Sequence, residues 1–158
     1  MQNPTFTRQA PAPGMGSRAR QRDLDWCADD QFISMRVFYR GSGGLAQAPE
    51  LLALFKRHAG PNVATLARWI VERQVIGFEW QRQTWFPLFQ FSRQDLAPDP
   101  RLRPVFAELT GVYDAWELAN WFARPNPWLT DRVPVDTLDS DRAAVLYAAR
   151  ADRFVAHG

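Results

Sequence analysis

The stretch WFARPNPWL, residues 121–129, decides how the C-terminal part of the chain folds. Pro125 and Pro127 each lack a backbone N–H and restrict the residue before them, so neither fits inside a continuous helix. The sequence therefore predicts that a helix ends near Ala123. A stiff turn follows, and it carries large apolar side chains at both ends. Such a turn either fills a core or presents apolar groups to another molecule.

The composition is that of an ordinary globular chain with one or two domains. Of the 158 residues, 46% are hydrophobic and 23% are charged, and the net charge of +2 is too small to indicate a nucleic-acid-binding protein by itself. Cys27 is the only cysteine, which excludes an internal disulfide. The chain contains neither a membrane-spanning apolar run nor the apolar stretch of a signal peptide. We therefore expect a cytoplasmic protein.

The N-terminal quarter is predicted to contain little regular structure. Residues 1–22 hold three prolines and four arginines without periodicity, which favours a disordered basic tail. Within residues 23–45, apolar side chains alternate with polar ones over residues 32–39, and this period of two predicts a strand. The following GSGG, residues 41–44, is typical of a flexible linker.

Residues 46–97 show the order helix, helix, hairpin. One helix begins at Pro49 and ends at Gly60, and a second is capped by Asn62 and runs to Gly77. Alternating aromatics on either side of a polar tip at residues 81–83 then predict a hairpin with Pro87 on its edge. This order suits a small winged, helix-turn-helix-like DNA-binding module, and the alternative is a solvated surface. The arginines available for phosphate contacts are Arg68, Arg73 and Arg82.

Residues 98–158 are predicted to be helical, so the fold class is mainly α with a small β-hairpin. Asp99 and Asp114 are in position to cap helices, and residues 134–138 suit a single helical turn. Ser140 is expected to cap the last helix. The inner face predicted for that helix consists of Ala144, Tyr147, Ala148, Ala151 and Val155.

The chain is poor in groups that perform catalysis. His58 and His157 have no nucleophile at a defensible spacing, and no established metal, nucleotide or hydrolase motif occurs. The acidic residues 23–30 match no calcium loop. We therefore expect no enzyme activity, no metal and no cofactor. Tryptophan, phenylalanine and arginine dominate binding energies at protein contacts, and they concentrate around residues 116–128.

The segment WFARPNPWL, followed by PVDTL and one more helix, resembles the toxin-binding domain of the MbcA/ParS/Xre antitoxins. The residues that match are Trp121, Pro125, Asn126, Leu129, Pro134, Val135 and Leu138. WFPLFQF, residues 85–91, is similar to a stretch often found ahead of that domain, so the resemblance covers residues 85–158. The family often has a glycine soon after the leucine, where this chain has Thr130, Asp131 and Arg132.

The resemblance implies a binding partner instead of a reaction. Such antitoxins place their C-terminal bundle over the active site of a RES-type toxin that consumes NAD, and they tend to form homodimers that repress their own operator DNA. Here RADRFVAHG, residues 150–158, is the segment expected to enter the toxin's cleft. The partner-binding residues that we expect are Trp121, Arg124, Pro125, Asn126, Trp128, Leu129, Arg150, Arg153 and Phe154.

Overall fold

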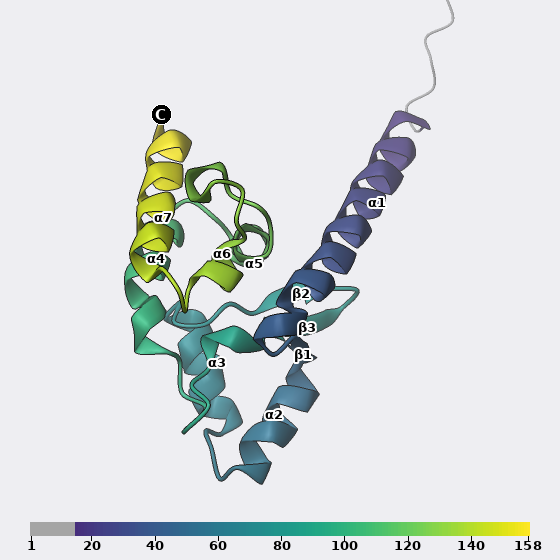
Figure 1. Ribbon diagram of the computed structural model, residues 1–158. Helices are drawn as coiled ribbons and strands as arrows, with labels where there is room; N and C mark the ends of the chain where they lie inside the picture. The colour runs from purple at the N-terminus through teal and green to yellow at the C-terminus, as the bar shows by residue number, and fades with distance from the viewer. Residues whose placement is uncertain (1–14) are drawn as a thin grey trace, which may run out of the picture.

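The computed structural model describes the backbone of residues 15–158 and the side chains of residues 27–158. This part of the chain is mainly α-helical with a small antiparallel sheet, as predicted (Figure 1). The helices are α1 (Met15–Phe38), α2 (Ala48–Arg57), α3 (Val63–Val71), α4 (Arg103–Leu109), α5 (Ala115–Phe122), α6 (Pro134–Thr137) and α7 (Arg142–His157). The strands are β1 (Leu45–Gln47), β2 (Phe78–Trp80) and β3 (Gln83–Pro87). No helix among the described residues has both the length and the apolar character needed to cross a membrane.

The strand predicted at residues 32–39 is wrong, because this segment is the end of the long helix α1 followed by a 3-10 turn. The buried side chains are Phe32, Met35 and Tyr39, which recur at the spacing of a helix face. Ile33 and Val37, which completed the period-two pattern, face solvent. Contacts with distant residues favour the helix, since the ring of Phe32 stacks on Trp80 with centroids 3.7 Å apart.

The predicted tail is corrected in part. Residues 15–22 belong to α1, which extends away from the rest of the molecule in Figure 1. Residues 1–14 lie outside the described part of the chain.

The predicted Gly-rich linker is an ordered turn. Gly43 and Gly44 have φ of 106° and 83°, in the left-handed region that glycine adopts without strain. The N–H of Gly44 donates to the carbonyl of Tyr39 at 2.7 Å, and its carbonyl accepts from Leu88 at 2.9 Å. The turn directs Leu45 into strand β1.

The hairpin is confirmed, and a third strand completes the sheet. Gln81 and Arg82, with φ of 49° and 60°, form the two-residue turn between β2 and β3. Strand β1 pairs with the other side of β3, so the strand order is β1-β3-β2. Pro87 therefore lies at the end of the central strand, opposite Leu45, and not on a free edge.

Two hydrophobic clusters lie on opposite faces of this sheet, because neighbouring side chains of a strand point to opposite faces. Phe78 and Trp85 join a cluster made by α1 and by α4 to α7. Phe86 joins a second cluster with α2 and α3. The buried side-chain amide of Gln90 connects the segments beside the sheet, since it accepts from the N–H of Ile76 at 2.6 Å and donates to its carbonyl at 2.8 Å.

Several predicted helix ends are confirmed and two are corrected. Asn62, Asp99 and Asp114 each accept a backbone hydrogen bond at the start of a helix. Helix α3 ends at Val71 instead of Gly77, and Arg73 just beyond it takes a positive φ of 54°. The last helix is capped by Asp141 and not by Ser140.

Candidate functional site

The turn after α5 is organised around Asn126. Its side-chain oxygen accepts from the N–H of Trp128 at 2.9 Å, and its carbonyl accepts from Leu129 and Asp131 at 3.0 Å each. Its own N–H donates to the carbonyl of Arg132 at 3.1 Å. Asn126 therefore holds the backbone of residues 126–132 in a compact loop through its own hydrogen bonds. Helix α5 ends at Phe122, with Ala123 as its C-cap, as the prolines predicted.

A carboxylate from the last helix fastens this turn. Asp152 Oδ2 accepts from Trp121 Nε1 at 2.6 Å and from Asn126 Nδ2 at 2.8 Å, and Asp152 Oδ1 accepts from Trp128 Nε1 at 2.9 Å. Hydrogen bonds to a charged acceptor are stronger than neutral ones. Asp152 thus holds two indoles and the turn-forming asparagine against α7.

Sequence reasoning did not identify Asp152 as part of the site. The signal was present, because a buried indole N–H needs an acceptor and Asp152 is the only carboxylate within α7. What the sequence does not provide is the fold that brings residues 121 and 152 together.

The predicted contact residues of the turn divide into buried and exposed ones. Trp121 is 1% exposed, and Asn126 and Leu129 are buried as well. These three residues shape the turn and are not available for direct contact with a partner. Trp128 is 46% exposed, and Arg124 and Pro125 are exposed too. The residues of the turn that a partner can contact directly are therefore Arg124, Pro125 and Trp128.

The predicted inner face of α7 needs correction. Ala148 is buried as expected, but its buried neighbours are Val145 and Ala149. Tyr147 is 62% exposed, and Val155 faces solvent as well. Small side chains on the buried side let α7 lie close to α4, which leaves the larger ones outside.

The outer side of α7 carries an apolar surface. Phe154, which is 80% exposed, stands seven residues after Tyr147, and this spacing places both on one side of the helix. Val155 is exposed about 100° further round the helix from Phe154. Trp128 is held by Asp152, which lies on another side of α7 from Tyr147 and Phe154. We refer to Tyr147, Phe154 and Val155 as the C-terminal face.

The two predicted arginines of α7 are both paired with one carboxylate of α4. Arg150 Nε lies 3.1 Å from Glu108 Oε1, and Arg153 Nη1 lies 2.6 Å from Glu108 Oε2. Both arginines remain largely solvent-exposed. These pairs fix α7 against α4 and leave guanidinium surface beside the C-terminal face.

The three arginines predicted for DNA contact lie on separate elements. Arg68 is exposed on α3, and Arg82 is exposed at the tip of the hairpin. Arg73 donates to the carbonyl of Thr110, which holds its side chain against the C-terminal part of the chain. Of the three, Arg68 and Arg82 are therefore the ones whose side chains remain available for phosphate contacts.

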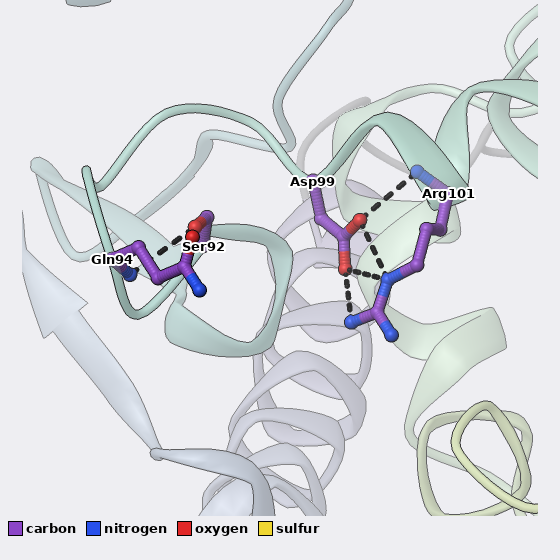
Figure 2. A network of polar contacts seen from close by, with 4 residues as sticks. All are labelled: Ser92, Gln94, Asp99 and Arg101. Atoms are coloured by element: carbon purple, nitrogen blue, oxygen red, sulfur yellow. Dashed lines mark hydrogen bonds and ion pairs between the residues drawn. The ribbon is translucent and has the colours of Figure 1, made fainter.

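A shallow hollow of about 480 Å³ lies beside Arg73, between the end of α3 and α4. Its charged lining residues are Glu72, Arg73, Asp99 and Arg103, so positive and negative groups balance. Asp99 is already engaged: its carboxylate accepts from the backbone and guanidinium N–H groups of Arg101 at 2.7 to 2.9 Å (Figure 2). Hydrogen bonding to Arg101 lowers the pKa of Asp99 from its ordinary value. The hollow shows no arrangement that selects a ligand.

Among the residues whose side chains are described, no three His, Cys, Asp or Glu groups are placed to hold a metal ion. Comparison of the chain with protein-family models, with curated proteins and with solved structures gave no match. Function is therefore inferred from the residues and their geometry.

Proposed function

We propose that the protein is a non-enzymatic, antitoxin-like interaction protein that binds and blocks a partner toxin through its C-terminal helical region. The observation that carries the proposal is the C-terminal face, where Tyr147, Phe154 and Val155 are exposed on a helix that Asp152 and Glu108 hold against the rest of the C-terminal part. Apolar side chains that are exposed close together on a surface are typical of protein contact sites. The expected partner is a RES-type toxin that consumes NAD.

The support under this face favours tight binding. Asp152 ties α7 to the turn, and Glu108 ties to α4 the helix that carries Tyr147 and Phe154. Because the helix backbone is held before binding, little backbone entropy is lost when a partner contacts it. Aromatic anchors with arginine beside them are the usual composition of energetically dominant contacts.

The backbone of the turn supports the relation to the MbcA/ParS/Xre antitoxins. Thr130 and Asp131 have φ of 56° and 58°, in the left-handed region that favours glycine. Glycine is the residue that the family often has shortly after the leucine. The chain therefore differs from the family pattern in residue type at this point, but its backbone takes the left-handed conformation that glycine commonly adopts.

Inhibition by this surface requires no chemistry from the protein itself. The last residues of α7, from Phe154 onward, are exposed and follow the contacts of Asp152 and Arg153, so they are the part that can enter a cleft while α7 stays packed on α4. An aromatic ring inside the cleft excludes substrate, and the arginine pairs with carboxylates at its rim. Catalysis in the toxin then stops because its site is occupied.

The test is co-expression with a RES-type toxin encoded beside the protein's gene. The intact protein is expected to restore growth and to form a complex with the toxin in size-exclusion chromatography. Phe154→Asp is expected to abolish both, since it places a charge at the centre of the contact. Val37→Asp, at an exposed apolar position of α1, is the matched control and is expected to behave as the intact chain. Protection by Phe154→Asp equal to that of the intact chain would refute the proposal.

DNA binding by residues 46–97 is the second candidate. It is favoured by the exposed Arg82 at the tip of a hairpin that follows two helices. Binding to DNA upstream of the gene is expected to weaken steeply with salt and to weaken further in Arg82→Ala and Arg68→Ala. Arg36→Ala on α1 is the control. Gel retardation that is unchanged by both module variants would exclude this use of the module.

A further inference from the structure

Four exposed residues follow one line along α7, which lies at the outer edge of the molecule in Figure 1. The buried side of this helix consists of Val145, Ala148 and Ala149. At about 100° per residue, the opposite side carries exposed residues at intervals of four, three and four positions: Ala143, Tyr147, Arg150 and Phe154. We refer to these four residues as the outer seam of α7.

The spacing of the outer seam fits a second helix laid along it. Side chains at alternating intervals of three and four residues form the seam of a coiled coil, where each one inserts between side chains of the facing helix. Tyr147 and Phe154 stand seven residues apart, which is about 10 Å along the axis, and a facing helix repeats its side chains at the same distance. Residues about 10 Å apart in a strand are three positions apart and point to opposite faces, so a strand fits this seam less well.

The outermost charge beside the two rings is positive. The side chains of Arg150 and Arg153 are 61% and 49% exposed, whereas the Glu108 carboxylate that they share is 15% exposed. One carboxylate balances only one of the two guanidinium charges, and each guanidinium group has more N–H donors than its pair with Glu108 uses. The carboxylate of α7 itself, Asp152, is turned toward the loop that contains Trp121. A helix on the outer seam is therefore expected to place a carboxylate opposite Arg150.

A second copy of the same seam does not meet this condition. In a two-fold contact the same surface faces itself, so the arginines of the two copies would lie close together. Like charges repel each other, and they do so more strongly where water is excluded. An acidic helix of another protein is the occupant that fits both the rings and the charge.

Building on the toxin-binding function proposed above, we propose that the outer seam of α7 packs against an acidic amphipathic helix of the toxin, at the rim of the cleft that the end of α7 enters. Apolar side chains of that helix contact Tyr147 and Phe154, and one of its carboxylates pairs with Arg150. Ala143 and Tyr147 precede Phe154 by about three and two turns, so they lie outside the cleft.

Isothermal titration calorimetry with the purified RES-type toxin encoded beside the gene measures this contact. Tyr147→Ala removes a ring that is 62% exposed and leaves the packed side of α7 unchanged. It is expected to weaken binding about tenfold or more. Ile33→Ala, at a position of α1 that is 60% exposed, is the matched control and is expected to bind as the intact chain does. Binding of Tyr147→Ala equal to that of this control would overturn the proposal.

Substitutions of Ala143 test the charge of the partner helix. This residue is exposed near the start of α7, so a charge placed there breaks no ion pair of the protein. Ala143→Glu is expected to weaken binding roughly twofold to fivefold and Ala143→Lys to strengthen it by a similar factor, with both effects shrinking as salt is added. Stability of the free helix changes in the opposite order, because a carboxylate near a helix N-terminus is favourable. Equal binding of the two variants, or the reverse order, would exclude an acidic helix as the occupant.

The outcomes separate this proposal from the proposed function. If the intact chain does not bind the toxin, both fail. If the intact chain binds and Phe154→Asp abolishes binding, while Tyr147→Ala and the two Ala143 variants bind as the intact chain does, toxin binding stands and the outer seam is not part of the contact. Sedimentation equilibrium of the free chain is the last control, and a dimer that is lost in Tyr147→Ala would assign the seam to a second copy and contradict the proposal.

Discussion

Replacing Asp152 by alanine tests whether one carboxylate holds the turn and the last helix together. The change removes the acceptor for three donors at once: the indoles of Trp121 and Trp128 and the amide of Asn126. The hydrogen bonds of Trp121 and Asn126 lie inside the protein, whereas the indole of Trp128 can turn to water. The two buried donors therefore account for most of the expected loss.

The magnitude follows from the burial of these donors. A buried donor left without a partner costs about 1–3 kcal/mol, so two of them cost roughly 2–6 kcal/mol. The better helix propensity of alanine offsets about 0.5 kcal/mol of this. The free energy of unfolding is therefore expected to fall by about 2–5 kcal/mol, which corresponds to a decrease in Tm of roughly 5–15 °C for a chain of this size.

Asp152→Asn separates shape from charge. The amide oxygen of the asparagine can still accept hydrogen bonds. Its NH2 group cannot, so a donor that bonds to the second carboxylate oxygen in the intact protein loses its acceptor. We expect a smaller loss of stability than in Asp152→Ala, with Trp128 as the donor that is released, since it is the exposed one.

Urea unfolding followed by circular dichroism gives the free energies, and the indole N–H signals in NMR show which tryptophan is released. Asp30→Ala removes an exposed carboxylate of α1 and is the matched control, expected to change stability by less than about 0.5 kcal/mol. If Asp152→Ala were as stable as this control, the three hydrogen bonds would not hold the turn and the reasoning would be refuted.

Two further predictions concern other parts of the fold. Gly77→Ala is expected to lower the free energy of unfolding, measured in urea, by about 1–3 kcal/mol. The reason is that an added Cβ would lie 2.6 Å from Cε1 of the buried Phe86. Gly111→Ala, whose Cβ would meet no atom within 4 Å, is the control. The lowered pKa of Asp99, due mainly to hydrogen bonding by Arg101, means that its ionised form stabilises the folded state above the pKa of the unfolded chain. The stability difference between the intact protein and Asp99→Asn is therefore expected to be present near neutral pH and to disappear as the pH falls through the folded pKa; a difference independent of pH would contradict this.

Local signals made much of the helical part of the fold predictable. Asn62, Asp99 and Asp114 act within three residues of their own position, so their capping roles are readable from the sequence. Pro125 and Pro127 likewise act on the residues next to them, so the end of α5 was predictable from the sequence. The alternating aromatics predicted the hairpin, because its strands are neighbours along the chain.

The remaining features depend on residues far apart in the sequence. The apolar residues of the segment 32–39 fit both the period of two of a strand and the spacing of a helix face. The contact of Phe32 with the distant Trp80 favours the helix. Strand β1 has three residues and forms by pairing with β3, about forty positions later. The hydrogen bonds of Asp152 join residues 24 to 31 positions apart, which no local pattern encodes.

The position of Asp152 connects the fold of the C-terminal part with the surface proposed for binding. Phe154 follows Asp152 by two residues in the same helix, and Arg153 between them pairs with Glu108 of α4. The residues that hold α7 in place are thus interleaved with the residues that the helix presents to solvent. A partner that pulled α7 away would break the ion pairs with Glu108 of α4 and the hydrogen bonds of Asp152 to the turn, and it would leave the buried indole N–H of Trp121 without its acceptor. We therefore expect a partner to bind the C-terminal face as a preformed unit, with α7 still packed on α4.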